Sequence, residues 1–256
     1  MLNLQIRNNQ NQLFEVTGTN KWDVLSVEGI TPPAATITTS QNAMTYGETI
    51  NNINIGKRNI IIKLNMKHPL DDNRQYLYQL FNAGEKIRLY LSSSEKMVYI
   101  DGYVESVTFT LFDKVQQPVI SIICPKPLFI AKNPINDKFT KTISYSVYND
   151  GLKTGAIFTM TINESVSDPT ITNKVNGDTF TVEGTYQIGD VITINTNEGY
   201  KNVTLKRDGK TYNWMNNISD NSMYNWISIA KGDNEFVVSS DNIACSIYST
   251  LKYQGV

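Results

Sequence analysis

The sequence contains few of the residue types that carry out catalysis. It has one histidine, His68, followed directly by Pro69, and two cysteines, Cys124 and Cys245. A Ser-His-Asp or Cys-His mechanism would have to use His68, yet neither cysteine lies near it in the sequence and no nucleophile-elbow motif is present. We therefore expect His68 to be an exposed corner residue without a catalytic role.

Metal and phosphate sites are equally poorly supported. One histidine and two cysteines are too few for an ordinary zinc site. Gly151–Gly155 is glycine-rich, but it lacks the Gly-Lys-Ser/Thr ending of a phosphate-binding loop. Aspartates could supply calcium ligands or a glycosidase acid pair, yet nearly all lie beside Gly or Asn, where turn geometry alone favours Asp. The six considered are Asp168, Asp178, Asp190, Asp208, Asp233 and Asp241. We expect no metal, no cofactor and no enzymatic activity.

Four aromatic residues, Tyr212, Trp214, Tyr224 and Trp226, flank a polar bend in the second half of the chain. Sugar-binding sandwiches use exposed aromatic rings as platforms for pyranose rings, so one interpretation is a carbohydrate-binding module. The other is that the rings cap the core of a sandwich. We favour the second, because residues 226–229 alternate as the buried face of a strand would.

The composition limits the partners of the chain. Its 256 residues include 23 basic and 24 acidic residues, for a net charge of −1, so it lacks the basic excess typical of nucleic-acid binding. No stretch approaches the roughly 18 apolar residues needed to cross a bilayer, and the N-terminus alternates like a strand. We expect no membrane partner and synthesis in the cytoplasm. Cys124 and Cys245 lie in apolar, β-branched surroundings and are interpreted as buried, reduced thiols, with a disulfide left open.

Alternation with period two dominates the first half and predicts strands. Residues 54–66 read as one long strand, followed by strands at 86–91, 97–111 and 119–124. Residues 69–84 interrupt the pattern and predict a helix, with Asp71 or Asp72 capping its first turn and Gly84 ending it. In the long strand, four apolar side chains share one face: Ile60, Ile62, Leu64 and Met66.

Residues 125–138 hold three prolines and are interpreted as a connector between two domains, residues 1–135 and 136–256. In the second, turn signals recur every ten to twenty residues around Val, Ile and Thr runs, which predicts an antiparallel sandwich. An alternating strand over residues 243–253 closes it.

A series of short motifs runs along nearly the whole chain. In order, they are residues 56–60, a helix with Leu77, Leu80 and Phe81, residues 82–86, Tyr99 with Gly102, residues 121–127, 188–196, 201–209, 232–234 and 253–256. Together they resemble the motifs of the distal tail proteins (Dit) of siphophages that infect Gram-positive bacteria. Lys126 replaces an Asp that is common in the family's closing Cys-Pro-Asp-Pro signature. The C-terminal motifs are similar to those of the family's galectin-like domain.

The resemblance implies a mainly β protein. Its N-terminal part would be a β-sandwich-like ring domain with one helix and a protruding β-hairpin, and its C-terminal part a galectin-like antiparallel β-sandwich. Family members form a ring, usually a hexamer, in the virion at the distal end of the tail. The implied partners are further copies of the chain in one ring or two stacked rings, the tail tube protein, a tail-associated lysin or tail-spike hub protein, and receptor-binding or baseplate proteins.

Residues 34–43 and 45–54 could form the protruding hairpin, continuing into the strand to Met66. A protruding edge is an aggregation hazard in a monomer, and closed cyclic assembly removes it. We expect ring contacts at Asn52, Ile53, Asn54, Lys57 and Arg58, and outer partner contacts at Tyr212, Trp214, Tyr224 and Trp226. The alternative function is a carbohydrate-binding module that contacts the host cell wall directly, and a wall-degrading hydrolase is the least favoured hypothesis.

Overall fold

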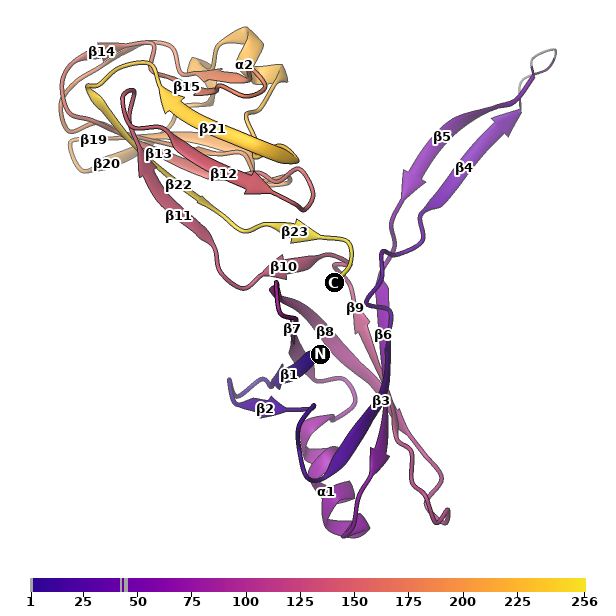
Figure 1. The fold of residues 1–256 in the computed structure, drawn as a ribbon. Helices are drawn as coiled ribbons and strands as arrows, with labels where there is room; N and C mark the ends of the chain where they lie inside the picture. Colours follow the sequence, from indigo (N-terminus) through magenta and orange to yellow (C-terminus); the bar gives the residue numbers. More distant parts are fainter. Residues whose placement is uncertain (1, 42, 44–45) are drawn as a thin grey trace. The chain divides into compact units, whose positions relative to one another are not determined.

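The computed structural model of the chain describes residues 2–41, 43 and 46–256. The chain divides into two compact units, one reaching to Lys132 and taking up Tyr253–Val256 again, the other spanning Asn133–Lys252 (Figure 1). All strand pairs with a described register are antiparallel, and the predicted mainly β fold is confirmed. The division falls close to the predicted boundary at 135, but the last four residues return to the first unit.

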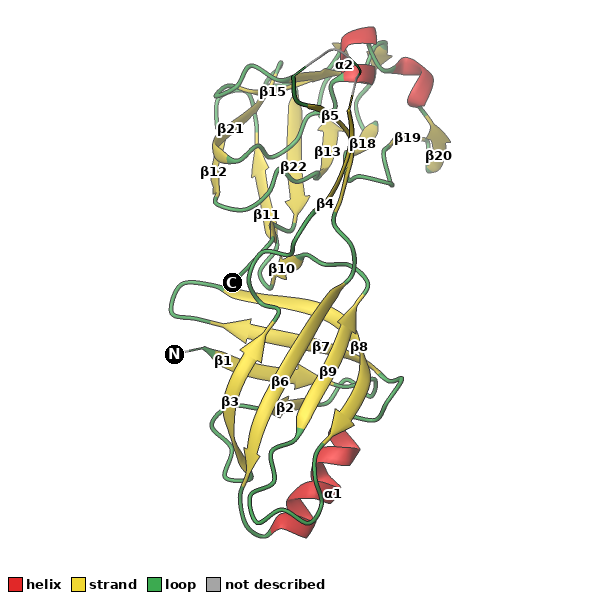
Figure 2. Cartoon of the chain, turned by 90° about the vertical axis from the view of Figure 1, so that its right-hand side faces the viewer, coloured by secondary structure: helices red, strands yellow, loops and turns green. Residues whose placement is uncertain are grey.

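The main sheet of the first unit runs in the order β2-β1-β7-β8-β9-β6-β3. Figure 2 shows β3, β6 and β9 crossing over β1, β2 and β7, so that the sheet folds into two layers around its core. Strand β10 (Phe129–Ala131) pairs with β8 and with β23 (Lys252–Tyr253), whose Tyr253 belongs to this unit. The main strands are β1 (Asn3–Arg7), β2 (Leu13–Glu15), β3 (Trp22–Glu28), β6 (Arg58–Met66), β7 (Lys86–Ser92), β8 (Met97–Thr108) and β9 (Val119–Cys124).

Strand β6 lies between β9 and the edge strand β3 and contributes one face to the core. The predicted buried face of Ile60, Ile62, Leu64 and Met66 is confirmed, because each of these side chains is at most 6 % exposed. The predicted strand over 54–66 is nevertheless wrong in its length. Strand β5 ends at Asn54 and β6 begins at Arg58, because the chain leaves the hairpin there and enters the core.

Helix α1 (Leu70–Leu80) forms where the sequence predicts it and buries Leu77 and Leu80 against the sheet. The predicted capping is wrong at both ends. Pro69 occupies the N-cap without a side-chain hydrogen bond, and the Asp71 carboxylate instead accepts from Arg74. Gly84 does have a positive φ of 85°, but it lies in the turn after the helix, where its N–H donates to the Val104 carbonyl at 2.8 Å. His68 is exposed, as expected.

The predicted protruding hairpin consists of β4 (Thr36–Gln41) and β5 (Glu48–Asn54). These strands pair only with each other, and every residue in both is exposed. Figure 1 shows them running side by side away from the main sheet of their unit. Of the residues predicted to form the hairpin, Asn42 and Thr45 lie outside the described residues.

The second unit is an antiparallel sandwich. Its larger sheet has the order β11-β22-β13-β18-β19-β20 and its smaller sheet β12-β21-β15-β16, with β14 and β17 as a separate pair. Helices η1 (Met215–Asn217) and α2 (Asp220–Tyr224) follow β20. The strands are β11 (Ile135–Phe139), β12 (Tyr145–Asn149), β13 (Ile157–Ile162), β14 (Val166–Ser167), β15 (Thr170–Asn173), β16 (Thr179–Thr181), β17 (Thr185–Tyr186), β18 (Val191–Asn195), β19 (Asn202–Arg207), β20 (Lys210–Asn213), β21 (Gly232–Val238) and β22 (Ile243–Ser249).

Several predicted elements around the second unit need correction. The predicted connector over 125–138 does contain the division between the units, after Lys132. It is more structured than a connector, however, because it contains β10 and most of β11 and because Phe129 is buried in the first unit's core. The closing strand over 243–253 is split after Ser249 into β22 and the short β23. Residues 226–229 form no strand, although Ile227 and Ile229 are buried.

Both cysteines are free and buried, as predicted. Burial raises the pKa of the Cys124 thiol to about 11 and raises that of Cys245 as well, so neither is a thiolate at neutral pH. In the part of the chain that the structure describes, no helix combines the length and the apolar character needed to cross a membrane.

Candidate functional site

The hairpin carries a stripe of isoleucines on one face. Ile37 pairs directly with Ile53, and Thr39 pairs with Ile50, with a shift in register between Thr38 and Thr39. Directly paired residues share a face, and so do alternate residues of one strand. Ile50 and Ile53 are three residues apart and would point to opposite faces of a regular strand. The bulge at Asn51 brings both to the face of Ile37.

This stripe has no cover within the described chain. The side chains of Ile37, Ile50 and Ile53 are 55 %, 57 % and 58 % exposed, and no third strand pairs with the hairpin. A two-stranded hairpin without a packed face is marginally stable in water. Contiguous exposed apolar side chains of this kind mark surfaces that bind a partner. The hairpin is therefore a candidate assembly surface.

The predicted ring residues lie at the hairpin and its base. Asn52, Ile53 and Asn54 are exposed in β5, and Lys57 is exposed in the segment between β5 and β6. Whether they contact a second copy stays a prediction. Arg58 does not belong with them, because its side chain is buried and occupied within its own unit.

The Arg58 guanidinium binds four main-chain carbonyls. Nε donates to Pro127 and Nη1 to Thr31, each at 2.8 Å, while Gly29 accepts from Nη1 and Gln254 from Nη2. Two of these carbonyls precede β4, and Arg58 itself follows β5, so the guanidinium joins both legs of the hairpin at its base. The other two carbonyls belong to Pro127, in the segment that leads to β10, and to Gln254, near the C-terminus.

No carboxylate pairs with this buried cation in the described chain. Burial lowers the pKa of Arg58, and the nearby Cys124 partly opposes that shift. Arginine nevertheless stays protonated in proteins, so the carbonyl dipoles must stabilise the charge. The guanidinium also lies over the Phe129 ring, 4.6 Å from its centroid. Sequence reasoning took this residue for a surface contact, because a lone arginine beside a polar loop gives no signal of burial.

The four predicted aromatic contacts of the second unit differ in their exposure to solvent. Trp214 is half-buried, and its indole N–H donates to the Tyr186 hydroxyl at 2.7 Å. Trp226 packs on Phe180, with ring centroids 5.1 Å apart. The capping interpretation is therefore right for both tryptophans. Tyr212 and Tyr224 are 44 % and 83 % exposed and remain available to a partner.

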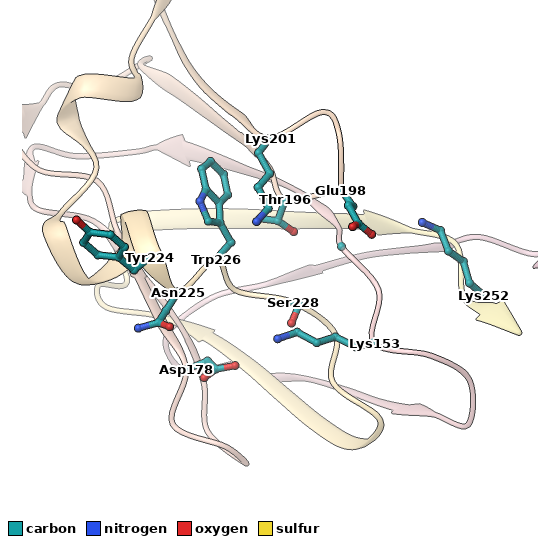
Figure 3. Close-up of a pocket in the computed structure, with 11 residues that line it drawn as sticks. Lys153, Asp178, Thr196, Glu198, Lys201, Tyr224, Asn225, Trp226, Ser228 and Lys252 are labelled. Atoms are coloured by element: carbon teal, nitrogen blue, oxygen red, sulfur yellow. The ribbon is translucent and has the colours of Figure 1, made fainter. Parts of the chain in front are cut away.

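Tyr224 and Trp226 do meet at a pocket, which neither Tyr212 nor Trp214 lines. It has a volume of about 370 Å³ and also contains Ser228 and three lysines (Figure 3). Sequence analysis missed this pocket, since its lysines come from segments about fifty residues apart.

One ion pair of the second unit was also missed. Asp190 was interpreted as a turn aspartate, but its carboxylate is buried and accepts two hydrogen bonds from Arg207, from Nε at 2.9 Å and Nη2 at 2.5 Å. These bonds hold the pKa of Asp190 below its usual value. Asp168 and Asp208 do occupy turn conformations, with φ of 49° and 51°. Among the described residues, no three His, Cys, Asp or Glu side chains gather as a metal site would require.

The sandwich has a known relative in sequence. Residues 151–254, which cover most of the second unit, match the family model described as the siphovirus-type tail component, C-terminal domain. The sequence of the second unit is thus similar to that of a siphovirus-type tail component domain. A search of curated proteins gives no match.

Comparison of folds extends the likeness to the whole chain. The crystal structure of SPP1 Dit, described as a paradigm of hub adsorption apparatus in phages infecting Gram-positive bacteria, superposes with a TM-score of 0.65 at 13 % identity over 99 % of each chain. Two structures of the phage P2 baseplate in its activated conformation, with Ca and with Sr, give TM-scores of 0.46 and 0.47 at 13 % and 14 % identity over 100 % of each chain. The fold assignment rests on SPP1 Dit. The resemblance drawn from sequence motifs is confirmed: residues 151–254 match a siphovirus-type tail component, and the chain as a whole shares the fold of SPP1 Dit.

Proposed function

We propose that this Dit-like chain is a structural joint of the tail, in which identical copies close into a ring of six. The ring would connect the tail tube to a tail-associated lysin or tail-spike hub protein and would hold receptor-binding or baseplate proteins on its outside. The chain would act by binding and not by catalysis. Its place of action would be the distal end of the virion tail, after synthesis in the host cytoplasm.

The uncovered isoleucine stripe carries this proposal. Burying Ile37, Ile50 and Ile53 against a second copy would remove apolar surface from water and would stabilise the hairpin that presents them. In the proposed ring, the hairpin would contact a different part of the neighbouring copy, so the contact would be head-to-tail. Contacts of this type either close into rings or grow into filaments.

The second unit offers the surfaces for outer partners. The exposed rings of Tyr212 and Tyr224 are the kind of residue that anchors protein interfaces. We assign them to receptor-binding or baseplate proteins, and we retain Lys57 with the hairpin residues for the ring.

The test is the assembly state of the whole chain. Light scattering and electron microscopy should find rings whose mass is six or twelve times 28.9 kDa, alone or with a tube or hub protein added. The double variant Ile37→Asn/Ile53→Asn should remain folded and lose the rings. Ile188→Asn is the matched control, because Ile188 is an exposed isoleucine of the second unit, and it should leave the rings intact. A wild-type chain that stays monomeric and binds neither protein would contradict the proposal.

A further inference from the structure

The pocket of the second unit gathers charged and polar groups from four separate parts of the chain. Lys153 precedes β13, Lys201 precedes β19, Lys252 follows β22, and Ser228 lies between α2 and β21. Its volume of about 370 Å³ lies within the range of small-molecule sites. Figure 3 shows these side chains around one opening, with the Trp226 indole among them.

Ser228 is the least expected member. Its side chain is only 5 % exposed, and its hydroxyl has no hydrogen-bond partner among the described residues. The buried neighbours Ile227 and Ile229 fix its position, and Ile229 also exchanges main-chain hydrogen bonds with Thr154. A buried hydroxyl without a hydrogen-bond partner destabilises the fold, so buried hydroxyl groups are normally hydrogen-bonded. Because Ser228 lines the pocket, a ligand there could satisfy it.

The three lysines give the pocket its positive charge. Lys153 and Lys201 are exposed and Lys252 is half-buried, and none of the three forms a salt bridge among the described residues. The ammonium group of Lys201 lies over the Trp226 ring, 5.5 Å from its centroid. Three unpaired ammonium groups around one opening favour a ligand with a carboxylate or a phosphate.

Two carboxylates, of Asp178 and Glu198, line the same pocket. They would repel a ligand that carries only negative charge, and they accept hydrogen bonds from hydroxyl groups. The site therefore suits a molecule that combines an acidic group with several hydroxyls. We propose that this pocket binds an acidic saccharide, with the lysines on its acidic group and Ser228, Asp178 and Glu198 on its hydroxyls.

The aromatic residues favour a sugar over an acidic peptide. The Trp226 ring already contacts Phe180 and Lys201, so it offers little free apolar surface to a side chain of a peptide. Tyr224 stands at the rim, where its ring is 83 % exposed and can cover the C–H face of a pyranose. The proposal does not depend on ring formation.

Isothermal titration calorimetry with the full chain tests the site. Hyaluronan tetrasaccharide is the acidic probe, chitotetraose the neutral one, and hexaglutamate the acidic peptide. We expect the acidic tetrasaccharide to bind at least about tenfold more tightly than the neutral one. The double variant Lys153→Gln/Lys201→Gln should bind the acidic tetrasaccharide about tenfold more weakly than the wild type, and Ser228→Ala should weaken this binding by a smaller factor.

The matched control is Lys206→Gln/Lys210→Gln, which removes the same charge from exposed lysines outside the pocket. It should bind like the wild type. If this control lost as much affinity for the acidic tetrasaccharide as Lys153→Gln/Lys201→Gln, binding would reflect general electrostatic attraction, and the proposal would be overturned. Absence of binding by both tetrasaccharides would also overturn the proposal. So would tighter binding of hexaglutamate than of the acidic tetrasaccharide, because the pocket would then be a contact for a protein. Because calorimetry works on any assembly state, a negative result here leaves the proposed ring untouched.

Discussion

The hairpin of the first unit and the sandwich of the second use the same residue types for opposite purposes. Strand β5 reads Glu-Thr-Ile-Asn-Asn-Ile-Asn and is exposed throughout, whereas β13 reads Ile-Phe-Thr-Met-Thr-Ile and buries every second residue. In the sandwich, a second sheet covers the apolar face of β13. The ring of Phe158 packs on Phe236 of that sheet, with ring centroids 5.6 Å apart. The hairpin has no such sheet within the described chain. The comparison teaches that the isoleucines of the hairpin have no apolar surface to pack against within the described single chain.

Truncation of a core ring should give the largest loss of stability. Phe158 is fully buried between Phe139 and Phe236, so Phe158→Ala would leave a cavity and lower the free energy of unfolding of the second unit by about 3–5 kcal/mol. Ile53→Ala in the hairpin should change it by less than about 0.5 kcal/mol. Unfolding in urea, monitored by hydrogen exchange with mass spectrometry, measures the free energy of unfolding of each unit separately. Equal losses in the two variants would erase the contrast between hairpin and sandwich.

The base of the hairpin should be the next most sensitive point. Arg58→Met removes a guanidinium that binds four carbonyls, and we expect the first unit to lose about 3 kcal/mol. Hydrogen exchange should accelerate around residues 29–36, 127–131 and 253–256. Lys57→Met is the control, because the neighbouring Lys57 is exposed, and it should leave exchange unchanged. Unaltered protection in Arg58→Met would show that the hairpin legs are held by other contacts.

The sequence predicts the elements with regular patterns and misses those set by distant contacts. Strand β9 has the predicted bounds of Val119–Cys124, and the alternating face of β6 is right, because burial with period two is a local signal. The sequence does not reveal the strand within the proline-rich connector, since the pairing of β10 with β8 depends on residues about thirty positions away. For the candidate sites, composition located the hairpin and the aromatic pair at the pocket. The burial of Arg58 and the lone hydroxyl of Ser228 follow only from the tertiary structure.

An ion pair in each unit allows a sharper test with pH. Asp190 is buried against Arg207, and hydrogen bonds from that guanidinium lower the pKa of Asp190. A lowered folded-state pKa stabilises the protein above the unfolded value of about 4, and this stability is lost as pH falls from there through the folded-state pKa. We expect Asp190→Asn to cost the second unit about 2 kcal/mol at pH 7, and less below pH 4. Thermal unfolding at a series of pH values measures how the stabilities of Asp190→Asn and the wild type converge at low pH.

The matched pair in the first unit is Asp101 with Arg88. Hydrogen bonding to Arg88 also lowers the pKa of Asp101, but both side chains are 36 % exposed, so solvent screens the pair. Asp101→Asn should therefore cost only about 0.5 kcal/mol, and salt should reduce that cost further. If Asp101→Asn were as destabilising as Asp190→Asn, burial would not explain the difference between the two pairs.

Replacement of the whole hairpin should have little effect on stability and a complete effect on assembly. Thr36 and Asn54 are directly paired, so an Asn-Gly turn can join the chain after removal of residues 36–54. Because none of the described side chains in β4 or β5 is buried, the free energy of unfolding should change by less than about 1 kcal/mol. Rings should be absent in electron micrographs. A loss of stability comparable to that of Phe158→Ala would mean that the hairpin supports its own unit, and its exposed isoleucines would then no longer argue for a neighbouring copy.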